Sequence, residues 1–152
     1  MIGSLFYVTT SRPDVKQIVG MVARFQVGPK ESLVHAVKRI FWYLKGTIDL
    51  GLWYPRKKSF TLKSYLDTDW EGCVDDKKNT SGWVLFFGES LVAWTSKKQT
   101  SISLYTTKDD YIIAVDCCAK MEWMKKTLHD IKVVFEKPRV IYCDNTSAIS
   151  LS

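Results

Sequence analysis

Three aspartates are the residues of this chain whose type and position could do chemistry. Asp67 ends the short run of residues 64–66, Asp110 opens a long segment with helical spacing, and Asp144 ends the apolar run of residues 140–143. Carboxylates at the ends of two predicted strands and in the first turn of a predicted helix can converge on divalent cations. Two such cations stabilise the attacking and leaving oxygens in phosphodiester hydrolysis. This arrangement therefore suits a metal-dependent phosphodiesterase site.

Each carboxylate also has a structural interpretation. Asp110 lies on the apolar face of its predicted helix, because residues 110, 114, 117, 121, 124 and 128 step by three or four. A charged group on a buried face is costly unless it is paired or bound to metal, but the helix dipole also favours an acidic residue in the first turn. Asp144 can instead serve as a turn or capping residue for a helix that starts at Asn145. Asp67 and Asp69 share one face of their strand, since strand side chains alternate.

The elements that must position these residues follow from apolar periodicity and from turn residues. Helical spacing predicts one helix from Arg12 to about Phe25, capped by Ser11, and a second from Leu33 to Leu44, ended by Gly46. Strands are predicted at residues 51–55, 60–67, 83–87 and 91–95, the last two as a hairpin, and again after residue 138. The longest helix is predicted at residues 107–131. This order alone predicts an α/β or α+β class.

The second predicted helix carries basic and aromatic residues on its remaining faces, namely His35, Lys38, Arg39, Trp42 and Lys45. One interpretation is a surface that tracks nucleic acid, and the other is a solvated helix face. The net charge of +6 and the pI near 9.1 favour a polyanionic partner. We expect weak, salt-sensitive binding of nucleic acid through this helix and through Lys57, Lys58, Lys97 and Lys98.

The cysteines and the hydropathy of the chain indicate the cellular compartment in which we expect it. The four cysteines form no CxxC pair and the chain has two histidines, so the spacing of a zinc site is missing. Adjacent Cys117 and Cys118 indicate core residues of a reduced, intracellular protein. No run is long enough to cross a membrane, and no secretory signal is evident at the N-terminus. We therefore expect a protein of the cytoplasm or nucleus that does not contact membranes.

Several motifs, in series along the chain, resemble a known family. Residues 65–73, 78–83, 94–99 and 142–149 resemble the YSDADWAGC, RKSTSGY, WSSKKQ and YCDNQSAI blocks of copia-type retrotransposon Pol polyproteins. Residues 2–7, 11–14, 36–40 and 43–47 resemble blocks near the end of the reverse transcriptase in the same polyproteins. The resemblance covers essentially the whole chain in order.

This resemblance implies a fold, a substrate and a set of site residues. It implies the C-terminal helical segment of a reverse transcriptase at residues 1–58, then a C-terminally incomplete ribonuclease H-like domain at residues 59–152. That domain is an α/β mixed sheet with a crossover helix. Asp67, Asp110 and Asp144 would be the catalytic and metal-binding residues, holding two Mg²⁺ ions for hydrolysis of RNA in RNA–DNA hybrids. The residues expected to contact nucleic acid are Asn79, Ser81, Lys97, Lys98 and Gln99.

The chain also departs from the family pattern. Where the family has STEAEY, residues 106–111 read Thr-Thr-Lys-Asp-Asp-Tyr, so that Asp110 replaces a catalytic glutamate and Lys108 replaces another. A further acidic ligand of the family comes from sequence beyond the YCDNQSAI block. We therefore expect the ancestral ribonuclease activity to be weak or lost. The alternatives are a non-catalytic interaction or effector protein with an acquired protein partner, and a remnant without function.

Overall fold

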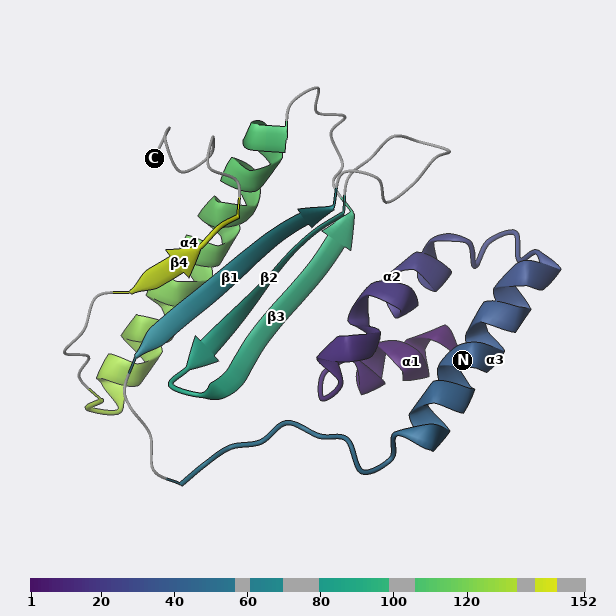
Figure 1. Cartoon of the computed structure of the whole chain (residues 1–152), viewed down its shortest axis with the longest axis horizontal. Coiled ribbons are helices and arrows are strands. Elements are labelled where there is room, and N and C mark those ends of the chain that lie inside the picture. Colours follow the sequence, from purple (N-terminus) through teal and green to yellow (C-terminus); the bar gives the residue numbers. More distant parts are fainter. Residues whose placement is uncertain (57–60, 70–79, 99–105, 134–138, 145–152) are drawn as a thin grey trace. The chain divides into compact units, whose positions relative to one another are not determined.

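The computed structural model describes residues 1–56, 61–69, 80–98, 106–133 and 139–144 of the 152. The chain divides into two compact units, Met1–Leu52 and Trp53–Ser152. The first contains helices only, and the second contains a four-stranded sheet with one long helix (Figure 1). None of the described helices combines the length and the apolarity that crossing a membrane requires.

The first unit is built from α1 (Ile2–Val8), the short 3₁₀ helix η1 (Pro13–Val15), α2 (Lys16–Arg24) and α3 (Glu31–Gly46). Its core follows the helical spacing of apolar residues, because positions three or four apart lie on one helix face. The buried set is Leu5, Val15, Val19, Val22, Val37 and Ile40, with Leu33 and Leu44 packed against it. The two predicted helices and their buried faces are therefore confirmed in outline.

Three local predictions for this unit are wrong. Ser11 does not cap a helix, since its hydroxyl donates to the carbonyl of Val8 in the preceding turn, and α2 begins only at Lys16 after a 3₁₀ turn that contains Pro13. The helix α1 was not predicted at all. Ile18, Phe25 and Phe41 share the apolar periodicity but are exposed, with Phe25 at 54%. These side chains are exposed because, with three α-helices in this unit, part of the apolar face of a helix has no neighbouring helix to cover it.

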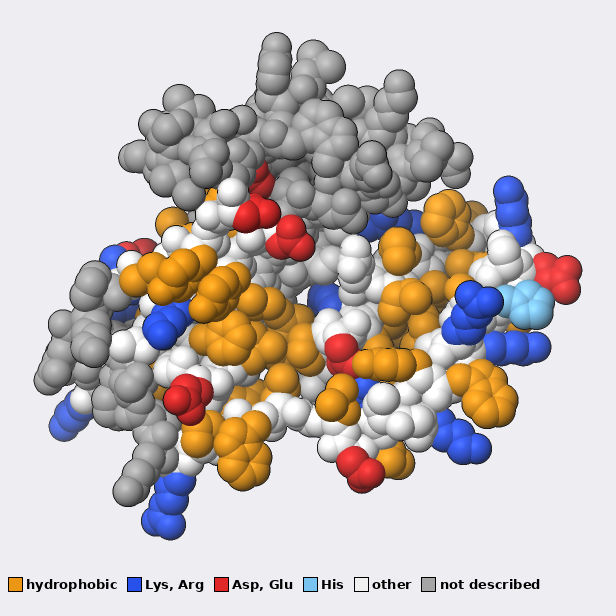
Figure 2. Space-filling model, viewed as in Figure 1, with side chains coloured by type: hydrophobic (Ala, Val, Ile, Leu, Met, Phe, Trp, Pro, Cys, Tyr) orange, Lys and Arg blue, Asp and Glu red, His pale blue; other side chains and the backbone are white. Residues whose placement is uncertain are grey.

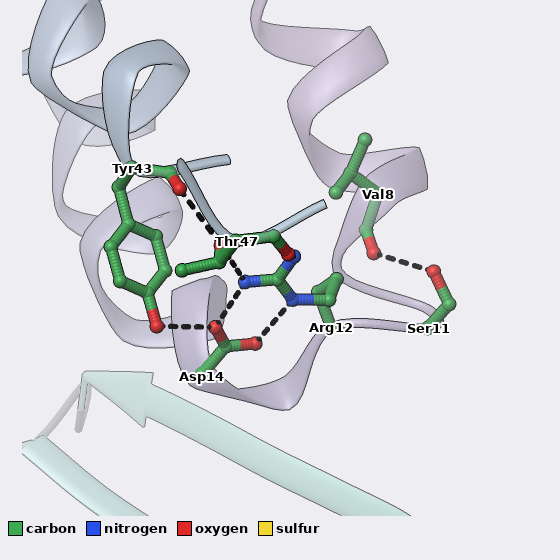
Figure 3. A network of polar contacts seen from close by, with 6 residues as sticks. All are labelled: Val8, Ser11, Arg12, Asp14, Tyr43 and Thr47. Carbon is green, nitrogen blue, oxygen red and sulfur yellow. Dashed lines mark hydrogen bonds and ion pairs between the residues drawn. The ribbon is translucent and has the colours of Figure 1, made fainter. Parts of the chain in front are cut away.

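A polar network ties the turn before α2 to the end of α3 (Figure 3). Arg12 donates through Nε and Nη2 to the two carboxylate oxygens of Asp14, at 3.0 and 2.7 Å. It also donates to the carbonyl and hydroxyl oxygens of Thr47, at 3.0 and 2.8 Å. The Tyr43 hydroxyl donates to Asp14 at 2.8 Å. Two of the four hydrogen bonds of this planar fork stay within the turn and two reach Thr47 at the end of α3, so the network fixes how the two segments meet.

The network makes the stability of the first unit depend on pH. Hydrogen bonds from Arg12 lower the pKa of Asp14 below its ordinary value of 3.8, and the Tyr43 hydroxyl lowers it further against the opposing effect of burial. A carboxylate with a depressed pKa stabilises the fold above its unfolded pKa, and that contribution is lost as the pH falls through the folded value. We expect the unfolding free energy of wild type to drop more steeply below about pH 4 than that of Asp14→Asn. Urea titrations at several pH values measure this difference, and parallel curves would contradict it.

The second unit is a mixed sheet with one long helix. Its strands are β1 (Leu62–Asp69), β2 (Thr80–Phe87), β3 (Ser90–Lys98) and β4 (Val140–Tyr142), in the spatial order β3-β2-β1-β4. The pairs β1–β2 and β2–β3 are antiparallel and β1–β4 is parallel, with α4 (Thr106–Asp130) preceding β4 in the chain. The α/β class is confirmed, and so is the order of the predicted elements from the strand at residues 60–67 to the strand after residue 138. The short strand predicted at residues 51–55 is wrong, since that segment has no strand.

The core of this unit lies between α4 and one face of the sheet. It contains Leu62 and Leu66 of β1, Trp83 and Leu85 of β2, and Ile113, Cys117 and Met121 of α4. Polar contacts cross the same interface, because Ser64 Oγ lies 2.8 Å from Cys117 Sγ and Trp83 donates to Asp116 at 2.8 Å. Burial raises the pKa of the Cys117 thiol. The predicted buried face of the long helix is confirmed, but Cys118, expected in the core, is exposed.

Candidate functional site

Asp67 lies in β1, and Asp144 lies two residues after the end of β4, the strand that pairs parallel to β1. The register pairs Lys63 with Val140 and Tyr65 with Tyr142, and Asp67 and Asp144 each follow the last of these pairs by two residues. The rings of Tyr65 and Tyr142 stack, with 4.8 Å between their centroids and 15° between their planes. Asp67 and Asp144 are both exposed. Their side chains therefore add two negative charges near the carboxyl ends of β1 and β4.

Asp110 comes from the helix instead. It lies early in α4, three residues before Ile113 and seven before Cys117, and is 5% exposed. Its burial agrees with its predicted place on the apolar face of the helix. Figure 1 shows α4 beginning at the end of the sheet where β1 finishes. The three predicted site residues thus come from three elements that meet at one end of the second unit.

The same three residues do not form a metal-binding group in the described conformation. Among the described residues, no three His, Cys, Asp or Glu side chains lie close enough together to hold an ion. The donor chemistry suits Mg²⁺, which prefers carboxylate oxygens, and Asp110 is buried whereas Asp67 and Asp144 are exposed. The catalytic and metal-binding roles of these residues stay predictions.

The residues predicted to contact nucleic acid are placed unevenly. Ser81 is 2% exposed within β2, so its side chain is withdrawn from the surface. Lys97 is exposed and Lys98 half-buried at the end of β3, which is at one edge of the sheet. Asn79 and Gln99 lie outside the described residues. The lysines therefore remain the accessible members of this set.

A stacked pair of tyrosines, two residues before Asp67 and Asp144 in the sequence, was not predicted. Tyr65 and Tyr142 are 46% and 45% exposed, and Phe86 meets the Tyr65 ring edge-on at 5.9 Å. The signal was present in the sequence, since a tyrosine stands two residues before each of Asp67 and Asp144. Cross-strand aromatic pairs of this kind stabilise strand pairing, and this one lies on the last described pair of the β1–β4 register.

Comparisons with known proteins give the relationships of the whole chain. It is 33% identical over 151 residues to the retrovirus-related Pol polyprotein from transposon RE1 of Arabidopsis thaliana, and 37% identical over 152 residues to that from transposon TNT 1-94 of Nicotiana tabacum. Each alignment covers 99% of this chain, which spans only about a tenth of either polyprotein, 10% and 11%.

A shorter relative is matched over most of its length. Secreted RxLR effector protein 161 of Plasmopara viticola is 32% identical over 124 residues, which are 81% of this chain and 87% of that protein. No protein-family model matches the chain, and no solved structure matches it significantly. The alignments across nearly its full length show that the chain is homologous to a segment of retrovirus-related Pol polyproteins of transposons and to this short relative.

Proposed function

We propose that this chain is a retrotransposon-derived protein in which the end of a reverse transcriptase, residues 1–58, precedes a ribonuclease H-like domain, residues 59–152. Its ancestral activity is metal-dependent hydrolysis of RNA in RNA–DNA hybrids. In this chain cleavage is weak or lost, while binding of nucleic acid remains. The observation that carries the proposal is the parallel pairing of β1 with β4, because Asp67 and Asp144 each follow the last described pair of that register, Tyr65 with Tyr142, by two residues.

The topology of the second unit supports the ribonuclease H-like assignment. An antiparallel β1-β2-β3 meander is followed by α4 and by a strand that pairs parallel to β1. In open sheets of this kind, ligands bind outside the carboxyl ends of parallel strands. Asp67, Asp110 and Asp144 would hold the Mg²⁺ ions there, and such ions generate a water nucleophile and stabilise the leaving oxygen.

Two features of Asp110 support weak or lost cleavage. Its side chain is one methylene shorter than the glutamate that the family resemblance implies, and it is 5% exposed on the face of α4 that also bears Ile113 and Cys117. A shorter buried carboxylate reaches less far toward exposed Asp67. Active-site groups must be held to within about 0.5 Å of the productive geometry. Lys108 adds a positive charge two residues away in the sequence.

A non-catalytic interaction or effector protein is the second candidate. The short relative from Plasmopara viticola, named a secreted effector, is matched over 87% of its length. The first unit also exposes large apolar side chains, among them Phe6, Tyr7, Val27 and Phe41. Exposed apolar side chains mark a site of protein association where they form one contiguous patch. On this reading the chain would bind a protein partner, whereas the first candidate acts on nucleic acid in the cytoplasm or nucleus.

Salt dependence of binding tests the nucleic-acid function. We expect an RNA–DNA hybrid to bind weakly, with about three phosphate contacts, so that affinity falls roughly 40-fold between about 50 and 200 mM salt. Lys97→Gln should make this fall shallower, because one phosphate contact is lost. Lys125→Gln, an exposed lysine on α4, is the matched control and should leave the slope unchanged. Fluorescence anisotropy measures both, and an affinity that is insensitive to salt would contradict an electrostatic mechanism.

A further inference from the structure

The outer face of α3 carries a stripe of cations around one tryptophan. The α3 stripe consists of His35, Lys38, Arg39, Trp42 and Lys45, all of them exposed. His35, Lys38, Trp42 and Lys45 step by three or four, so they follow one side of the helix. That side lies opposite the one that buries Val37 and Ile40. Figure 2 shows Lys and Arg side chains projecting from this part of the molecule.

Trp42 is the unusual member of the stripe. Its side chain is 72% exposed, although an indole is among the largest apolar groups that a protein can bury. Lys45 Nζ lies 5.7 Å from the ring centroid, within the range of a cation–π contact, so the ring lies beside a cation and keeps most of its surface open.

The charge along the stripe is positive. No acidic residue lies between Lys38 and Lys45 in the sequence of α3, which includes Arg39. Glu31 lies one turn before His35, with its carboxylate 3.7 Å from the imidazole, and so its charge falls at the N-terminal end of the stripe. The segment from His35 to Lys45 is roughly 15 Å long at 1.5 Å per residue. A polyanion of a few repeating charges matches this length and sign.

We propose that the α3 stripe binds a single-stranded nucleic acid, with Trp42 stacked on a base and Lys38, Arg39 and Lys45 contacting phosphates. The proposal deepens the proposed function, on which it rests, by naming the nucleic-acid class and a site for it in the first unit. Stacking on an exposed ring requires a base whose face is open, which a duplex hides and a single strand presents. Phosphates on either side of that base then lie over the cations that flank the ring.

The experiment compares two fluorescent oligonucleotides of equal length, one of thymidines and one abasic, by anisotropy with the whole chain at about 50 mM salt. Both carry the same phosphates, so only stacking separates them. Wild type should bind the thymidine strand about tenfold more tightly, since a stacked base contributes about 1–3 kcal/mol. Trp42→Leu should reduce that affinity to the abasic level. Trp53→Leu, which removes an even more exposed tryptophan outside the helices (81%), is the matched control and should change nothing.

The outcomes test the stacking site and the proposed function separately. Equal binding of both strands by wild type, or an unchanged thymidine affinity in Trp42→Leu with wild-type circular dichroism, would overturn the stacking site and leave the electrostatic binding of the proposed function intact. Absence of binding to the oligonucleotides and to the RNA–DNA hybrid alike would overturn the proposed function itself. Lys38→Gln should weaken both strands by the same factor, which separates its phosphate contact from the stacking of Trp42.

Discussion

Replacing Arg12 by alanine is expected to lower the unfolding free energy of the first unit by about 3 kcal/mol. The guanidinium is 9% exposed and makes four hydrogen bonds, two to Asp14 and two to Thr47. Removing the guanidinium leaves the partly buried Asp14 carboxylate with only the Tyr43 hydroxyl as a described side-chain partner. It also removes the hydrogen bonds that join this turn to Thr47 at the end of α3. Urea unfolding, followed by hydrogen exchange of peptides from α2 and α3, measures the effect on this unit alone.

Two variants make this result specific. Arg24→Ala removes an exposed arginine from the last turn of α2 and should cost less than about 0.5 kcal/mol. Arg12→Lys keeps the charge but should recover little stability, because a single ammonium cannot reproduce the planar fork that reaches Asp14 and Thr47 together. Equal losses in Arg12→Ala and Arg24→Ala would show that the network contributes nothing to stability.

The sequence predicts helices and their buried faces better than it predicts their ends. Val19, Val22, Val37 and Ile40 are buried as their spacing requires. The helix α1, by contrast, has seven residues and no side-chain cap. A segment this short, without residues that signal where a helix starts and stops, could not be predicted from the sequence. The partners of Arg12 lie at position 14 and at position 47. A contact over 35 residues is set by tertiary packing and has no local signature.

The same limit applies to the candidate site, where local elements could be predicted from the sequence but contacts between them could not. Asp67 and Asp110 lie on the strand and the helix that local patterns predict for them, whereas Asp144 follows β4 by two residues. The parallel pairing of β1 with β4 could not be predicted, because the register of parallel strands depends on which face of each strand is buried. Whether three carboxylates converge depends on side-chain reach, which element order does not determine.

Cleavage of RNA–DNA hybrids is the property expected to differ most from that of the family. We expect the chain to cleave at least roughly a hundredfold more slowly than a ribonuclease H that carries both family glutamates, since a misplacement of about 1 Å costs about that factor. The shortened side chain of Asp110 and the positive charge of Lys108 in place of a glutamate are two separate departures from the family pattern, so their effects should compound. Asp110→Glu alone should restore little, because it adds one methylene without changing the course of α4 or the charge of Lys108.

The most direct test is incubation of a labelled RNA strand, paired with DNA, with the purified chain and Mg²⁺, beside Asp67→Asn. Binding of the same hybrid is measured by anisotropy in the same samples. We expect wild type and variant both to bind at low salt and to release equal, background amounts of cleaved RNA. Robust Mg²⁺-dependent cleavage by wild type, abolished in Asp67→Asn, would contradict the loss of activity proposed here and establish the chain as a working ribonuclease.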